Sequence, residues 1–285
     1  MRKDAMKLVR YGPAGQEKPG MIDADGQLRD LSGQVADISG EVLSDAGIAR
    51  LAALDPASLP AVDGSPRFGP CVGQTSKILC IGLNYSDHAA ETGAEPPTEP
   101  IVFAKALNAL CGPNDDVEMP RNSQALDWEV ELAVVIGTKA KYVSEADAMN
   151  HVAGFAVMND VSERDFQTKR QGQWTKGKSH DTFGPLGPWL VTRDAVADPH
   201  NLSMWLDVNG ERRQTGNTST LIFNVPHVVS YLSQFMTLMP GDVISTGTPP
   251  GVAMGMKPPQ YLKVGDVMTL GIEGLGEQKQ TVIAA

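Results

Sequence analysis

The sequence predicts an α+β fold that is mainly β, and two observations carry this prediction. Most apolar runs after residue 77 are short and are bounded by Gly, Pro or Asp, which is typical of strands. These runs lie at 78–83, 128–136, 154–158, 205–208, 242–246 and 267–272. Helical patterns are few, and they do not alternate regularly with the strands as they would in a parallel α/β sheet.

Helices are expected at three places. One lies near 45–54, and a second begins after Ser144 as N-cap, with acidic residues in its first turn. A third begins after Asn224 and has Pro226 near its first position, where proline is favoured. This third segment carries an apolar face at helical spacing. The face consists of Val225, Val228, Val229, Leu232, Phe235 and Met236.

Two parts of the 285-residue chain differ in character, and a chain of this length has room for both. Residues 1–70 form a turn-rich stretch and predict a small N-terminal domain. This domain includes a linker, because 55–73 is rich in Pro, Ala, Gly and Ser. Residues 71–285 contain the longer strands and predict the catalytic domain.

Composition excludes several classes of protein. A net charge of -10 argues against a nucleic-acid binder, which would show a basic face. No apolar run approaches the roughly 18 to 20 residues of a membrane span. The first residues lack the apolar region of a secretory signal. The three cysteines show no C-x-x-C pairing and predict reduced thiols in the cytoplasm.

The sharpest local pattern is the pair of carboxylates in 127–132, DWEVEL. Alternate strand residues share a face, so Glu129 and Glu131 should point the same way at the mouth of a buried strand. They would repel each other and lose hydration, and a hard divalent cation such as Mg²⁺ would relieve both effects. The alternative is a solvated strand face. Asp127 lies at the entry of the strand, where a solvent-facing or capping role is expected.

A third carboxylate, Asp160, follows the apolar run that ends at residue 158. It precedes Ser162 and Asp165, which have the spacing of a capping box at a helix start. As the third member of a set, Asp160 would complete one face of an octahedral site for Mg²⁺ or Mn²⁺. The alternative is an ordinary turn residue.

A candidate general base lies earlier in the chain. His88 and Glu91 are three residues apart, so in a helical turn their side chains share a face. A carboxylate that holds an imidazole fixes its tautomer and strengthens it as a base. The alternative is an exposed ion pair. The polar stretch 92–97 is expected to be a lid over a bound ligand.

Two loops are further candidates. The first, 174–183, offers Lys178 as a cation for developing negative charge, or else as a surface lysine. The second, 245–252, has backbone amides and the Thr248 hydroxyl as possible donors to a carboxylate. It is not a P-loop, because the G-x-x-x-x-G-K-[ST] order is absent.

Five segments in this order resemble the fumarylacetoacetate hydrolase family. They are GLNYSDHAAE (82–91), DWEVELAVVIG (127–137), NDVSERDFQ (159–167), WTKGKSHDTFGPLGPW (174–189) and GDVISTGTPPGV (241–252). The resemblance covers roughly 75–285. The opening resembles a bacterial branch, often labelled ureidoglycolate lyase, that includes hydrolases of 2,4-diketo-3-deoxy sugar acids, notably the L-rhamnonate derivative.

The resemblance implies a mixed β-sandwich/β-roll core, a small N-terminal domain and a homodimer. It also implies Mg²⁺ or Mn²⁺ bound by Glu129, Glu131 and Asp160, with His88 and Glu91 as the water-activating pair. Residues expected to contact the substrate or its oxyanion are Tyr85, Lys105, Arg164, Gln167, Lys178 and Thr248. His180 either touches the substrate or neighbours the site.

The expected reaction is hydrolytic C–C cleavage of a 2,4-dioxo acid to pyruvate and a second acid such as lactate. The metal would hold the 1-carboxylate and the 2-oxo oxygen, and His88 would deprotonate a water that attacks the 4-carbonyl carbon. Lys178 and Gln167 would stabilise the resulting oxyanion. Two alternatives stay open: an oxoacid decarboxylase or tautomerase, and a non-catalytic module that binds oxoacids.

Overall fold

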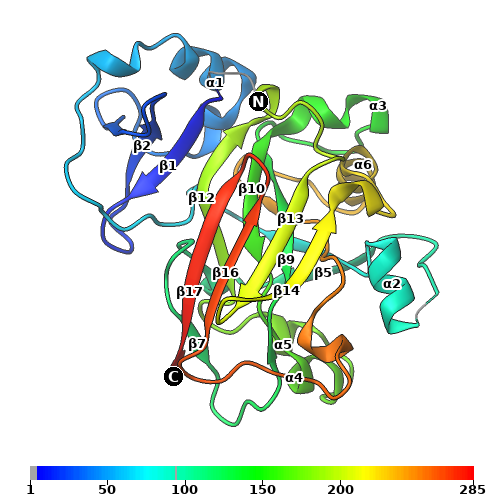
Figure 1. Ribbon diagram of the computed structural model, residues 1–285. Coiled ribbons are helices and arrows are strands. Elements are labelled where there is room, and N and C mark those ends of the chain that lie inside the picture. Colours follow the sequence, from blue (N-terminus) through cyan, green and yellow to red (C-terminus); the bar gives the residue numbers. More distant parts are fainter. Residues whose placement is uncertain (1–4, 94) are drawn as a thin grey trace.

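The computed structural model describes residues 5–93 and 95–285, which adopt the expected mainly β, α+β fold (Figure 1). The predicted lid, 92–97, therefore lies partly outside the described residues. In the described part of the chain, the strands form one large sheet, one smaller sheet and a two-stranded ribbon.

The large sheet contains β1 (Lys7–Tyr11), β2 (Lys18–Ile22), β3 (Leu28–Asp30), β4 (Ile78–Gly82), β5 (Ile101–Lys105), β6 (Leu110–Cys111), β9 (Val130–Ile136), β10 (Val152–Asn159), β12 (Gly184–Thr192) and β15 (Val243–Ser245). The smaller sheet contains β7 (Val117–Met119), β13 (Ser203–Val208), β14 (Glu211–Asn217), β16 (Val267–Ile272) and β17 (Gly276–Ala284). The ribbon pairs β8 (Leu126–Asp127) with β11 (Ser162–Glu163). The helices are α1 (Asp45–Ala52), α2 (Ser86–Thr92), α3 (Glu145–Ala148), α4 (Arg164–Thr168), α5 (Thr175–Lys178) and α6 (Val225–Phe235).

The path of the large sheet runs β3-β2-β1-β12-β10-β9-β15-β4-β5, with β6 added beside β12. The N-terminal strands extend this sheet, because β1 pairs antiparallel with β12 (Figure 1). At the centre, β9 and β10 are antiparallel neighbours. The division of the chain at residue 70 stays a prediction.

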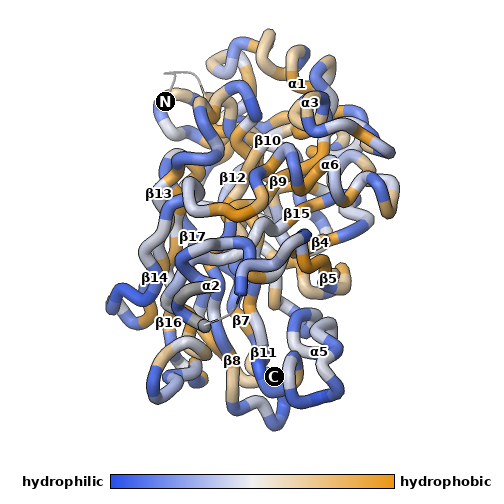
Figure 2. Tube along the Cα trace, turned by 90° about the vertical axis from the view of Figure 1, so that its right-hand side faces the viewer, coloured by the Kyte–Doolittle hydropathy of each residue, from blue (hydrophilic) through white to orange (hydrophobic). Residues whose placement is uncertain are grey.

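The core lies on both faces of the central strands. Every residue of β9 and β10 is buried, as expected for continuous apolar runs that are covered on both sides. The smaller sheet packs across one face, where β16 and β17 contact β10. Hydrophobic segments gather around β9, β10 and β15 in Figure 2. The ends of β9 and β10 are therefore supported by a fully buried part of the sheet, where local opening is unfavourable.

The three predicted helices are present, and the two with a predicted cap begin after it. The Ser144 side chain accepts from Asp147 N, and the Asn224 side chain accepts from His227 N. The helix after Ser144 is short, since α3 ends at Ala148. The capping-box prediction was wrong in its cap. Ser162 lies in β11 and donates to Asp160 O, while the Glu163 side chain caps α4.

The stretch 55–73, predicted as linker, packs against the N-terminal part of the chain. Leu59, Cys71 and Val72 are buried, and isolated bridges pair Ala61 with Arg29 and Phe68 with Tyr11. Its composition therefore reflects tight turns more than a free tether.

The prediction of thiols without disulfide bonds is confirmed, since all three cysteines are free. Among the described residues, no helix combines the length and apolar character needed to cross a bilayer. The cytoplasmic location stays a prediction.

Replacing Gly154 with alanine is expected to destabilise the fold. A Cβ there would lie 2.1 Å from the Val191 carbonyl oxygen, where β10 meets β12. Overpacking of this kind costs about 1–3 kcal/mol of unfolding free energy. Urea denaturation measures the loss. Gly33→Ala is the matched control, because no heavy atom lies within 4 Å of the added Cβ. Equal midpoints for both variants would contradict this account of β10 packing.

Candidate active site

Three carboxylates meet at one end of the central strands. Glu129 immediately precedes β9, Glu131 is its second residue, and Asp160 immediately follows β10. The antiparallel register opposes the start of β9 to the end of β10, and Asp160 N donates to Glu129 O at 2.9 Å. One oxygen of each side chain lies within 4.8 Å of the others. The structure thus brings the predicted trio together.

Two members of the trio are paired with buried cations. Lys178 Nζ donates to Glu129 Oε2 at 2.7 Å and to Asp160 Oδ2 at 2.9 Å. Arg164 donates to the other Glu129 oxygen at 2.6 Å, and Lys105 donates to Asp160. Burial alone would raise the pKa of Glu129, but Arg164 and Lys178 outweigh it and lower this pKa to about 2. Glu129 is therefore ionised at neutral pH.

Glu131 has different surroundings. It accepts hydrogen bonds from neutral groups, the Ser245 hydroxyl at 2.6 Å and Gly247 N at 2.8 Å. Burial, followed by repulsion from Asp160 and Glu129, holds the pKa of Glu131 well above its usual range. This carboxyl group is the one whose ionisation requires another positive charge.

The charge balance of the cluster fits a divalent cation. Four buried carboxylates face three buried cations, which leaves one negative charge in excess. They are Asp127, Glu129, Glu131 and Asp160, with Lys105, Arg164 and Lys178. Each carboxylate retains lone pairs beyond those bonds. Oxygen donors of this kind suit Mg²⁺ or Mn²⁺, and a dication would make the cluster positive by one, which favours an anionic substrate.

The predicted base pair is formed on α2. His88 Nδ1 lies 3.0 Å from Glu91 Oε2, and His88 is buried. Glu91 is anchored in turn by Gly251 N, which donates to its Oε1 at 3.1 Å. When Nδ1 donates to Glu91, Nε2 carries the imidazole lone pair. Glu91 therefore links the base to the loop after β15.

Most of these groups line a cavity of about 240 Å³, while Asp160 and Glu91 do not line it. Seven predicted residues line it: His88, Glu129, Glu131, Arg164, Gln167, Lys178 and Thr248. Trp174 and Gly247 lie in the two loops singled out from the sequence, and the other lining residues were not predicted, namely Ile81, Gly82, Leu83, Phe103, Thr168 and Met254. The position of Ile81 to Leu83 at the end of a strand beside His88 was the available signal. Phe103 and Met254 gave none.

Tyr85, Lys105 and His180 do not line this cavity. The Tyr85 hydroxyl donates to Met204 Sδ in the core, and Lys105 donates to Asp160 and to Val161 O. His180 lies between the rings of Phe166 and Phe183. In this structure Lys105 is paired with Asp160, one of the three candidate metal ligands. The predicted contacts of Tyr85 and Lys105 with substrate stay predictions.

The loop 245–252 uses its donors within the protein. Gly247 N donates to Glu131, and Gly251 N donates to Glu91. The amides of this loop therefore bind carboxylates of the protein, where a substrate carboxylate was expected. The Thr248 hydroxyl donates to Val130 O at 3.0 Å and accepts from Gln214 at 2.8 Å. A contact of Thr248 with substrate stays a prediction.

The solvent-facing role expected for Asp127 was wrong. This residue is fully buried in β8, and its Oδ2 accepts from Arg164 Nε at 2.8 Å. Its Oδ1 accepts from Ala253 N at 2.8 Å. Arg164 Nη1 also donates to Gln167 Oε1 at 3.1 Å, which leaves the amide NH₂ of Gln167 for a ligand. Asp127 thus positions Arg164 and, through it, Gln167.

Asp127→Asn is expected to lower the unfolding free energy by about 3–5 kcal/mol, because it breaks a buried ion pair from one side. The amide also turns a donor toward Arg164, which has no lone pair to accept it. Thermal and urea unfolding measure the loss. Asp165→Asn removes the exposed Asp165–Lys169 pair and should leave the midpoint nearly unchanged. Equal effects of the two substitutions would contradict this role.

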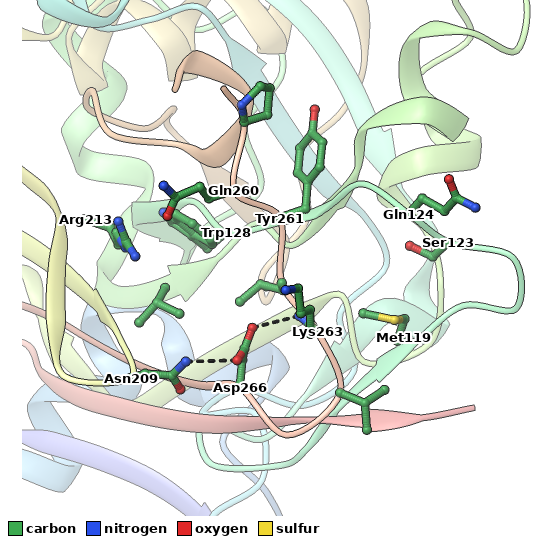
Figure 3. A pocket seen from close by; sticks show the side chains of 14 residues that line it. Met119, Ser123, Gln124, Trp128, Asn209, Arg213, Gln260, Tyr261, Lys263 and Asp266 are labelled. Atoms are coloured by element: carbon green, nitrogen blue, oxygen red, sulfur yellow. Dashed lines mark hydrogen bonds between the residues drawn. The ribbon is translucent and has the colours of Figure 1, made fainter. Parts of the chain in front are cut away.

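A larger cavity of about 650 Å³ is lined by Trp128, Tyr261 and Asp266, among other residues (Figure 3). Of the described residues that line it, Asp266 is the only carboxylate, and it already accepts from Asn209 Nδ2 and Lys263 N. This cavity offers no metal-type donor set, so the chemistry concentrates in the smaller one.

Comparison with known proteins agrees with this geometry. The family model for the fumarylacetoacetate (FAA) hydrolase C-terminal region matches residues 77–283. A protein of Burkholderia multivorans is 62% identical over 281 residues, which is 98% of this chain and 100% of that protein. That relative carries only a provisional hydrolase name, with no substrate.

Two solved structures are similar over nearly their whole length. Fumarylacetoacetate hydrolase from Exiguobacterium antarcticum is 37% identical, with a TM-score of 0.87, over 99% of this chain and 100% of that one. Maleylpyruvate hydrolase from Sphingobium sp. SYK-6, in complex with manganese(II) and pyruvate, is 28% identical. Its TM-score is 0.81 over 98% of this chain and 100% of that one.

Proposed function

This chain belongs to the fumarylacetoacetate hydrolase family, and we propose that it is a divalent-metal-dependent hydrolase that cleaves a C–C bond of a 2,4-dioxo acid. One observation carries the proposal. Glu129 and Glu131, from a carboxylate trio with excess negative charge, line the same cavity as His88, which Glu91 orients. A candidate cation site and an oriented general base beside the same small cavity are the groups that hydrolysis of an anionic oxo acid requires.

The reaction adds water across the bond between C3 and C4. The water oxygen bonds to C4, the C3–C4 bond breaks, and its electron pair passes to C3, which is then protonated. The products are pyruvate and the carboxylic acid derived from C4. No oxidant or second cofactor is required.

His88 removes the proton from the attacking water through Nε2. Its Nδ1 hydrogen bond to Glu91 at 3.0 Å holds the ring and stabilises the imidazolium that forms. The protonated His88 is then the source of the proton that C3 takes up. Gly251 N fixes Glu91 at 3.1 Å, so the base keeps its orientation during this transfer.

Lys178 and Gln167 stabilise the oxyanion that forms on the C4 oxygen. Both line the cavity, and burial among carboxylates keeps Lys178 protonated, since Asp160 and Glu129 raise its pKa against the opposing effect of burial. The Gln167 amide offers its NH₂ group, because its oxygen is held by Arg164. Mg²⁺ or Mn²⁺ held by Glu129, Glu131 and Asp160 supplies Lewis-acid stabilisation of negative charge on the oxo acid.

The finer substrate assignment rests on the resemblance described above. We propose 2,4-didehydro-3-deoxy-L-rhamnonate or a similar acid, which would give pyruvate and lactate. The pyruvate in the Sphingobium structure supports a pyruvate-forming reaction. We also propose that the protein is a homodimer and that it binds a small oxo acid as substrate. We propose no nucleic-acid or membrane partner.

Pyruvate release from 2,4-dioxo acids tests this function. With added Mg²⁺ or Mn²⁺ the protein should release pyruvate and one equivalent of the second carboxylic acid, and EDTA should abolish both. A decarboxylase would release CO₂, and a tautomerase would only interconvert keto and enol forms. Either of those outcomes, or binding without turnover, would overturn the proposal.

A further inference from the structure

The cavity that holds the catalytic groups is polar on one side and apolar on the other. Glu129, Glu131, Arg164 and Lys178 line the polar side. Ile81, Leu83, Phe103, Trp174 and Met254 line the apolar side, and the other six lining residues are Gly82, His88, Gln167, Thr168, Gly247 and Thr248. Met254 is 38% exposed, and Phe103 and Trp174 are half-buried, which places these side chains toward solvent.

Phe103 and Trp174 form a continuous wall. Their ring centroids lie 5.1 Å apart with an edge-on angle of 61°. Trp174 lies against the end of β4, where a Cβ on Gly82 would come within 2.8 Å of the indole. On the inner side, Lys178 Nζ lies 5.0 Å from the Phe103 ring centroid. The wall therefore begins at the oxyanion-stabilising lysine and leads outward.

The fixed cations of the cavity are already committed. Of the described residues that line it, Arg164 and Lys178 alone carry a permanent positive charge. All three Arg164 nitrogens donate, to Asp127, Glu129 and Gln167. Lys178 bridges Glu129 and Asp160. Lys178 is also assigned to the C4 oxyanion, so a second carboxylate on the substrate would find no further cation among the described residues that line the wall.

Among the neutral polar groups, the Gln167 NH₂ is assigned to the C4 oxyanion and His88 is the base, and Thr168, Thr248 and Gly247 N give no substitute. The Thr168 hydroxyl donates to Arg164 O at 2.8 Å, and the Thr248 hydroxyl donates to Val130 O at 3.0 Å. Gly247 N donates to Glu131. A carboxylate beside the aromatic wall would lose hydration without gaining donors, which is unfavourable.

We propose that the substrate is a monocarboxylic acylpyruvate whose neutral, largely apolar acyl group lies against Phe103 and Trp174. This inference rests on the proposed hydrolysis and specifies its substrate class. The 1-carboxylate and the oxo groups occupy the polar side, and the group beyond C4 occupies the apolar wall. Acylpyruvates that carry a second carboxylate on the acyl group are poor substrates.

A matched pair of substrates tests the proposal on the Mn²⁺-loaded wild-type protein. Butanoylpyruvate and succinylpyruvate have acyl groups of four carbons, and only the latter ends in a carboxylate. We expect kcat/KM for succinylpyruvate to be about 100-fold lower. Butanoylpyruvate should also exceed acetylpyruvate by about tenfold, since each buried methylene is worth about fourfold.

Trp174→Arg provides the second arm, because it places a cation on the wall. The butanoyl-to-succinyl ratio of kcat/KM should fall at least tenfold, while Trp174→Phe should keep the wild-type ratio. A general loss of activity cancels in this ratio, so a structural effect of Trp174 would not change it.

The outcomes separate the two claims. Turnover of succinylpyruvate equal to or faster than that of butanoylpyruvate would overturn this inference and leave hydrolysis standing. An unchanged butanoyl-to-succinyl ratio of kcat/KM in Trp174→Arg would likewise contradict the claim that the aromatic wall determines this preference. Absence of pyruvate from every acylpyruvate would overturn the proposed function and this inference with it.

Discussion

Glu131→Gln is expected to abolish metal-dependent turnover without weakening the metal-free fold. The amide is isosteric and still accepts from Ser245 and Gly247 N, but it carries no charge for a dication. Loss of an outer partner of a metal ligand already costs 10- to 100-fold in affinity, so loss of a ligand should cost more than about 100-fold. Removal of Lewis-acid stabilisation worth several kcal/mol should lower kcat/KM by roughly 10³-fold.

The choice of Glu131 makes this test specific. Substitution of Glu129 or Asp160 would leave buried cations unpaired, which is strongly destabilising. Among the described residues, Glu131 accepts only from neutral donors, the Ser245 hydroxyl and Gly247 N, so its neutral analogue should melt at or above the wild-type temperature without metal. Mn²⁺ should raise the melting temperature of the wild type alone. A variant that still gains stability from Mn²⁺ and turns over normally would refute the ligand assignment.

His88→Ala is expected to lower kcat by about 10²- to 10⁴-fold while metal binding persists. This range is the usual contribution of a positioned general base. His88 lies on α2, whereas the carboxylates lie at the ends of β9 and β10. Pre-steady-state and steady-state pyruvate release, with a parallel Mn²⁺ titration, measure the two quantities.

Glu91→Gln serves as the graded companion to His88→Ala. Its single oxygen, placed as Oε2, can still accept from His88 Nδ1 and from Gly251 N, which lie 3.0 and 3.3 Å from that atom of Glu91, but the charge that stabilises the imidazolium is lost. Its kcat should lie between those of the wild type and His88→Ala. Parallel losses of metal affinity and activity in either variant would assign α2 a structural role instead.

The central strands could be predicted because a strand that is buried on both faces consists mostly of consecutive apolar residues. The run at 128–136 predicted a strand, and β9 spans 130–136 of it. Prediction also found the carboxylates at its mouth, since Glu131 and Glu129 stand where charge interrupts that run. The pairing that brings Asp160 beside them is a contact between strands, and the resemblance, more than the local pattern, pointed to it.

Asp127 shows why other features escaped prediction. Its acidity suggested solvent, yet it is fully buried because Arg164 and the amides of the loop 253–254 satisfy it. Those partners are distant in sequence, so no local pattern encodes them. Phe103 escaped for the same reason, since it joins the cavity through β5 at the edge of the sheet.

The most direct test of the central claim is the number of Mn²⁺ ions that the metal-stripped protein binds, measured by electron paramagnetic resonance. Wild-type protein and His88→Ala should each bind one Mn²⁺ per chain, and Glu131→Gln should bind none at the same concentration. No bound Mn²⁺ in the wild type, or equal binding in Glu131→Gln, would contradict a metal centre at Glu129, Glu131 and Asp160.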